Sequence, residues 1–103
     1  KNISTYKERR NCTLQLLNQY FSSVATWDIP TGGLALWISF YPKISLLKFA
    51  SLAVEFNVFL PKTILYQDAN KCAIRFGFGH LNLEEIAVVI PNLKRAYFQL
   101  KEK

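Results

Sequence analysis

The stretch KCAIRFGFGHLNLEEIAVVIPNL, residues 71–93, predicts a strand followed by a helix. Alternate side chains of a strand point to opposite faces of a sheet. One face of residues 72–80 therefore carries three large apolar side chains: Ile74, Phe76 and Phe78. Arg75 falls on the other face, where Ala73 and Gly77 leave space beside its guanidinium. The pattern predicts a sheet with a buried face and with a second face on which Arg75 binds something.

The second half of this stretch opens a helix. Asn82 and Glu85 have the spacing of a capping box, in which each side chain accepts a hydrogen bond from the other residue's backbone N–H. Apolar residues then recur at helical spacing to form one face: Leu83, Ile86, Ala87, Ile90, Leu93, Tyr97 and Leu100. Pro91 lies inside this pattern and removes a backbone donor, so we expect it to kink the helix or to split it near Ile90.

The residues before this stretch predict five elements and a loop. They are a helix over 3–22 that starts before residue 1, strands over 23–28 and 34–41 joined as a hairpin by the turn IPTGG, a helix over 46–56 capped by Ser45, a strand over 57–60, and a loop over 62–71. The order suits an α/β fold class of the α+β two-layer sandwich type. We expect a small mixed sheet of about four strands with helices on one face.

Length and composition indicate one domain over residues 1–103. No uncharged stretch is apolar enough to span a membrane, and no export signal opens the chain. Cys12 and Cys72 have neither metal-ligand spacing nor a disulfide framework around them, which favours reduced thiols in the cytoplasm.

The net charge of +6 is confined to the two ends of the chain. Residues 1–10 and residues 94–103 each carry four basic residues and one acidic residue, whereas five of each balance between them. Terminal helices rich in Lys and Arg are usually solvated faces. Nucleic-acid binding by the chain itself is therefore weakly supported.

The sequence offers few groups for catalysis. His80 is the single histidine, and a histidine at a strand end is more often a turn residue than a base. No paired carboxylates, activated cysteine or metal cluster is visible, and GFGH lacks the third glycine of a dinucleotide fingerprint. Lys62 follows a proline in a loop, where an exposed lysine is the plainer interpretation than a Schiff-base lysine.

Arg75 is the strongest candidate for a binding residue. A guanidinium presents a planar fork that matches a carboxylate with two parallel hydrogen bonds, and it keeps its charge when buried. The alternative is a structural ion pair with Asp28, with Asp68 or with a residue of a missing domain. Spacing alone leaves both alternatives open.

Three motifs in order resemble a known family: WDIPTGGLALWISF, ISLLKFASLAVEFNVFLP and KCAIRFGFGHLNLEEIAVVIPNL. Together with YKERRN in the entering helix, they resemble the C-terminal small domain of fold-type I pyridoxal-phosphate (PLP) enzymes, the class I/II aminotransferases. The sequence RFGFGHLNLEEI is most similar to the MocR branch of GntR-family transcription regulators. The chain departs from the family at Lys62, where the enzymes commonly have glycine, and at Pro91, where their helix is continuous.

This resemblance implies that Arg75 grips the carboxylate of an amino-acid-like ligand. It also implies a parent that binds PLP in a large domain of the same chain, forms a homodimer, and binds DNA through an N-terminal winged helix. The 103 residues would then be a C-terminal, effector-sensing fragment without catalytic or cofactor-binding residues of its own, and its effector an amino acid or an amine.

Two other functions stay open. The chain could be the small domain of a genuine class I/II aminotransferase, in which Arg75 orients the substrate. It could also be a free-standing basic interaction module.

Overall fold

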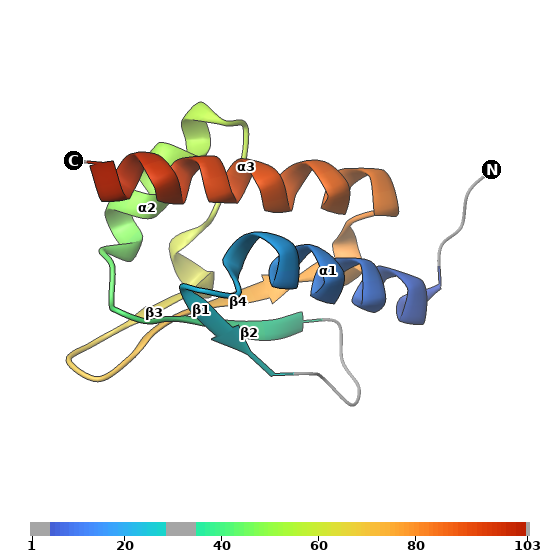
Figure 1. Ribbon diagram of the computed structural model, residues 1–103, viewed down its shortest axis with the longest axis horizontal. Coiled ribbons are helices and arrows are strands. Elements are labelled where there is room, and N and C mark those ends of the chain that lie inside the picture. The colour runs from blue at the N-terminus through green and yellow to red at the C-terminus, as the bar shows by residue number, and fades with distance from the viewer. Residues whose placement is uncertain (1–4, 29–34, 103) are drawn as a thin grey trace.

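The computed structural model describes residues 5–28 and 35–102. Its elements are α1 (Tyr6–Phe21), β1 (Ala25–Trp27), β2 (Ala35–Phe40), α2 (Leu46–Glu55), a 3₁₀ turn (Lys62–Ile64), β3 (Leu65–Gln67), β4 (Cys72–Gly77), a second 3₁₀ turn (Phe78–His80) and α3 (Leu83–Glu102). The predicted IPTGG turn lies outside the described residues. Figure 1 shows two layers, with α1 and α3 running side by side in the same direction above the sheet. The predicted α+β two-layer architecture is confirmed.

The four strands have the order β1-β2-β4-β3, and all three neighbouring pairs are antiparallel. The predicted hairpin of the first two strands is confirmed. The expectation of a mixed sheet was wrong, because the sheet is antiparallel throughout its described pairs. Strand β3 does run in the same direction as β2. Because β4 lies between β2 and β3, no two neighbouring strands are parallel.

The fourth strand lies in the predicted loop rather than at residues 57–60. Asn57 has a φ of 66°, a left-handed conformation that ends α2. The backbone N–H of Val58 donates to the carbonyl of Ala53 at 3.0 Å, which closes this turn. Val58 and Leu60 are nevertheless buried, so their apolar character reflects core packing without strand pairing. The strand that completes the sheet, at the edge next to β4, is instead Leu65–Gln67.

Helix caps define the helix starts. Thr5 and Glu8 form a capping box at α1, so the expectation that this helix begins before residue 1 was wrong. Ser45 caps α2, and Asn82 with Glu85 caps α3, as predicted. Pro91 lies inside one continuous helix and does not split it.

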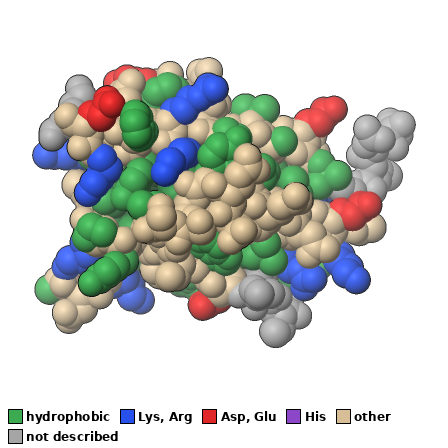
Figure 2. All heavy atoms as spheres, in the orientation of Figure 1, with side chains coloured by type: hydrophobic (Ala, Val, Ile, Leu, Met, Phe, Trp, Pro, Cys, Tyr) green, Lys and Arg blue, Asp and Glu red, His purple; other side chains and the backbone are tan. Residues whose placement is uncertain are grey.

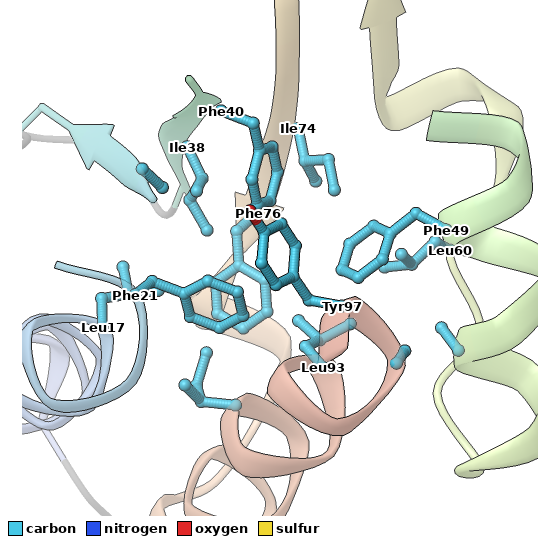
Figure 3. Close-up of a cluster of buried hydrophobic side chains, with 14 of the residues drawn as sticks. Leu17, Phe21, Ile38, Phe40, Phe49, Leu60, Ile74, Phe76, Leu93 and Tyr97 are labelled. Atoms are coloured by element: carbon cyan, nitrogen blue, oxygen red, sulfur yellow. The ribbon is translucent and has the colours of Figure 1, made fainter. Parts of the chain in front are cut away.

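The core lies between the helices and one face of the sheet. Figure 3 shows aromatic rings from all layers converging there. Phe49 contacts Phe40 edge-to-face at 5.6 Å between centroids, and Tyr97 stacks on Phe40 at 6.0 Å. The predicted inward faces of the two long strands are buried: Leu36, Ile38, Phe40, Ile74 and Phe76. No helix of the described residues covers the opposite face of the sheet.

Candidate ligand-binding face

Arg75 lies on the sheet face that no described helix covers. It is exposed in the middle of β4, while its neighbours Ile74 and Phe76 point into the core. In the sheet register Arg75 is directly opposite Trp37 of β2. The predicted orientation of Arg75 is thus what the backbone produces, because alternation leaves no other face for it.

Trp37 and Tyr66 form an aromatic pair across this face. Their ring centroids are 4.6 Å apart with an interplanar angle of 61°. Tyr66 is the register partner of Ala73, which is only 3% exposed although it lies on the open face. The diagonal contact between the two rings explains this burial, since a small side chain lets large cross-strand neighbours meet above it. The space expected beside Ala73 is therefore filled.

On the other side of Arg75, the neighbouring residues of the described strands are small. Gly77 and Ala35 are register partners, and both are partly exposed. Neither residue has a side chain larger than a methyl group. The surface of the sheet at this pair, called the floor below, therefore consists of backbone atoms and one Cβ. Of the two small residues that flank Arg75 in the sequence, Gly77 is the one over which no described aromatic pair lies.

A positive charge lies near the ring of Trp37, the register partner of Arg75. The Lys71 ammonium lies 5.4 Å from the centre of the Trp37 ring. Within residues 5–28 and 35–102, no ion pair joins Arg75 to a carboxylate, and both Asp28 and Asp68 are exposed. Asp68 instead accepts a hydrogen bond from the backbone N–H of Asn70 at 2.7 Å in the turn after β3. An anion approaching Arg75 would meet no carboxylate on the described strands.

The other candidates lie apart from this face or in turns. His80 is exposed in the turn after β4, and Lys62 is exposed at the start of the 3₁₀ turn before β3. Both cysteines are free; Cys72 is buried and donates its thiol hydrogen to the carbonyl of Ile44 at 3.3 Å. Burial raises the pKa of the Cys12 thiol above its ordinary value. In the part of the chain that is described, no group of His, Cys, Asp and Glu could hold a metal ion.

A hollow of about 470 Å³ lies on the helical side, away from Arg75. Its lining comes from all three α-helical regions: Tyr20, Phe56, Pro91, Lys94, Arg95, Phe98, Gln99 and Glu102. Figure 2 shows Lys and Arg side chains scattered over the viewed face, with hydrophobic side chains between them. No single basic patch gathers on that face. No described helix is both long enough and apolar enough to cross a membrane.

Sequence reasoning missed Trp37, Tyr66 and Lys71 as neighbours of Arg75. Trp37 was placed on the correct face of its strand, but whether that face was exposed stayed open. Tyr66 and Lys71 fell in the predicted loop. A period-two pattern is too short to detect in a strand of three residues such as β3.

No protein-family model matches the chain. Among curated proteins, it is 26% identical over 80 residues to the uncharacterized HTH-type transcriptional regulator YisV and 30% identical over 80 residues to the uncharacterized HTH-type transcriptional regulator YdfD, both of Bacillus subtilis. Each match covers 78% of this chain. The uncharacterized aminotransferase SSO0104 of Saccharolobus solfataricus is 30% identical over 92 residues, or 87% of the chain. The chain spans only 16%, 17% and 22% of these relatives' lengths.

Solved structures show the same fold. An archaeal alanine:glyoxylate aminotransferase superposes with a TM-score of 0.75 and 27% identity, over 95% of this chain and 24% of that one. The α-aminoadipate aminotransferase LysN of Thermus thermophilus superposes with a TM-score of 0.79 and 22% identity, over 94% of this chain and 25% of that one. Regulators and an aminotransferase thus share this chain's sequence pattern, and solved aminotransferases share its fold.

Proposed function

Since the chain resembles the C-terminal small domain of fold-type I aminotransferase-like proteins, with MocR-like HTH regulators among its relatives, we propose that it is the effector-sensing end of a GntR/MocR-type transcription regulator. Residues 1–103 would be one domain at the C-terminal end of a longer cytoplasmic protein. Arg75 would bind the carboxylate of an amino-acid-like effector.

The observation that carries this proposal is the position of Arg75. It stands exposed on a helix-free sheet face, opposite an aromatic residue and without an ion pair among the described residues. A planar guanidinium in that setting can accept a carboxylate in two parallel hydrogen bonds. The geometry of this chain thus supports ligand recognition independently of its relatives.

The parent would contain PLP, held by a large domain. None of the strand residues on the open face is an Asp or Glu that could pair with a pyridinium nitrogen. The described residues of this chain thus do not fit the cofactor by themselves. When bound, PLP supplies the electron sink for amino-acid chemistry. An effector would favour the conformation in which this domain closes onto the large domain. The shift from the open to the closed conformation would change how the winged-helix domains are arranged in the homodimer.

The second candidate is the small domain of a genuine PLP-dependent aminotransferase. It is favoured by the 30% identity to an uncharacterized aminotransferase and by the aminotransferase structures with this fold. Arg75 would then orient the substrate for chemistry done in the large domain. Transaminase turnover by the complete polypeptide, or regulated DNA binding by it, separates the two candidates.

The deciding experiment compares the full-length parent with its Arg75→Ala and Arg75→Lys variants. The twenty common L-amino acids serve as probes in calorimetric titrations. We expect Arg75→Ala to weaken the best binder by about 10- to 100-fold, because two charge-assisted hydrogen bonds are lost. Arg75→Lys keeps the charge but cannot form the two parallel hydrogen bonds. Its affinity should therefore lie between those of the unmodified parent and of Arg75→Ala.

Lys48→Ala is the matched control, because it removes an exposed positive charge from α2 on the other side of the sheet. Its affinity should equal that of the unmodified parent. Full affinity in Arg75→Ala for every amino acid that binds would overturn the assignment of Arg75.

A further inference from the structure

The two sides of Arg75 along β4 are unlike. Towards the start of β4, the Trp37 ring meets Tyr66 above Ala73. Towards the other end of the strand, the Ala35–Gly77 pair carries no side chain larger than a methyl group. A molecule bound to the guanidinium can therefore extend in one direction over the sheet and not in the other.

We infer that a ligand bound through Arg75 lies over the Ala35–Gly77 pair, and that Trp37, buttressed by Tyr66, is the positioning residue that closes the other side. This inference rests on the proposed function and adds to it the direction of the ligand and the residue that limits its size, Ala35. The ligand class is a carboxylate whose body is small or flat enough to lie on a sheet floor of small residues.

Trp37 acts through Arg75 for two physical reasons. An exposed arginine has many rotamers, and each must be given up on binding, so a ring beside it lowers the entropy lost. A guanidinium also stacks on aromatic faces, and a directly opposite cross-strand pair brings the two side chains within reach. Tyr66 fixes the Trp37 ring by the edge contact at 4.6 Å.

Lys71 adds a second contact to the Trp37 ring. Its ammonium lies 5.4 Å from the Trp37 ring centre, so the ring is held by a cation and by an aromatic neighbour. The aromatic wall is therefore built from three residues of β2, β3 and the turn before β4, and it does not depend on a ligand to form.

The first test is a pair of matched substitutions in the full-length parent. Ala35 and Ser39 are both in β2, on the same face, two residues either side of Trp37. Ala35→Leu should weaken the tightest-binding L-amino acid by at least about tenfold, because the added side chain occupies the floor. Ser39→Leu places the same bulk beyond the aromatic wall and should leave affinity unchanged.

Equal losses in the two variants, or a loss in Ser39→Leu alone, would overturn the inference while leaving Arg75 as the carboxylate ligand. If no amino acid binds the unmodified parent, the proposed function fails and the inference fails with it. If Arg75→Ala has no effect while amino acids bind, the role of Arg75 fails. The three failures are thus distinguishable.

The second test asks whether Trp37 acts through Arg75. Trp37→Ala should weaken the amino acid several-fold yet leave the affinity for its decarboxylated amine unchanged, and Trp37→Phe should restore most of the loss. In the Arg75→Ala background, Trp37→Ala should add nothing, because a positioning residue has nothing left to position. Additive losses, or equal losses for amino acid and amine, would show a general structural role and overturn the inference. Should Trp37→Ala not fold, Trp37→Leu gives the same comparison.

Discussion

The Gln67 side chain joins β3 to the first residue of α2, since its Oε1 accepts a hydrogen bond from the backbone N–H of Leu46 at 2.8 Å. Its Nε2 donates to the carbonyl of Ile44 just before the helix. Gln67 Oε1 thus supplies a partner for one backbone N–H that has none at the start of a helix, and the side chain connects β3 to the helical layer.

Removing this bridge should destabilise the chain. We expect Gln67→Ala to lower the free energy of unfolding by about 1–2 kcal/mol, because the Leu46 N–H and the Ile44 carbonyl lose their partner. Gln67→Glu keeps the acceptor for the Leu46 N–H and should lower the free energy of unfolding by less. Urea unfolding followed by circular dichroism measures both, and equal losses in the two variants would contradict the role of Oε1.

The core aromatic cluster should tolerate no truncation. Phe49→Ala should cost about 3–5 kcal/mol, because Phe49 is fully buried and contacts Phe40 and Tyr97 edge-to-face. Phe59 is 78% exposed, so Phe59→Ala is the matched control and should be nearly neutral. Similar midpoints for both variants in urea would show that this cluster does not stabilise the fold.

Pro91 should be a destabilising residue that the helix tolerates. Pro91→Ala restores a backbone donor inside α3, and we expect it to raise the unfolding free energy by about 1–3 kcal/mol. Asn92→Ala, at the next position, removes the 3.1 Å hydrogen bond that the Asn92 side-chain amide donates to the Phe56 carbonyl. This variant should lower the unfolding free energy. Thermal unfolding of both variants checks the opposite signs, and a destabilised Pro91→Ala would mean that α3 depends on the proline.

Cys12 should react slowly with alkylating agents at neutral pH. Burial raises its pKa, so the reactive thiolate forms at higher pH in the folded chain than in the chain unfolded by urea. Because the folded state holds the proton more tightly, any stability that Cys12 contributes is complete below the unfolded pKa and is lost as pH rises through the folded pKa. Mass spectrometry of labelling at each cysteine measures the pH profile, and coincident folded and unfolded profiles would refute the shift.

Local patterns predicted those elements that have a local cause. Alternation placed Arg75 on the open face and Ile74 and Phe76 in the core, and the Asn82–Glu85 spacing marked the start of α3. The short β3 could not be found in this way, and Val58 and Leu60 are apolar because they are buried rather than because they pair. The Thr5–Glu8 box was readable from the sequence and was missed.

By itself, the sequence determined the fold class, the helix caps near Ser45 and Asn82, and the face to which Arg75 points, because each depends on residues a few positions apart. Only the tertiary structure decided what surrounds Arg75. Sheet order and register brought Trp37 opposite Arg75 and laid the Trp37 and Tyr66 rings over Ala73, leaving Gly77 open. These residues are far apart along the chain, and their meeting is fixed by the packing of two layers around one core, for which no local pattern codes.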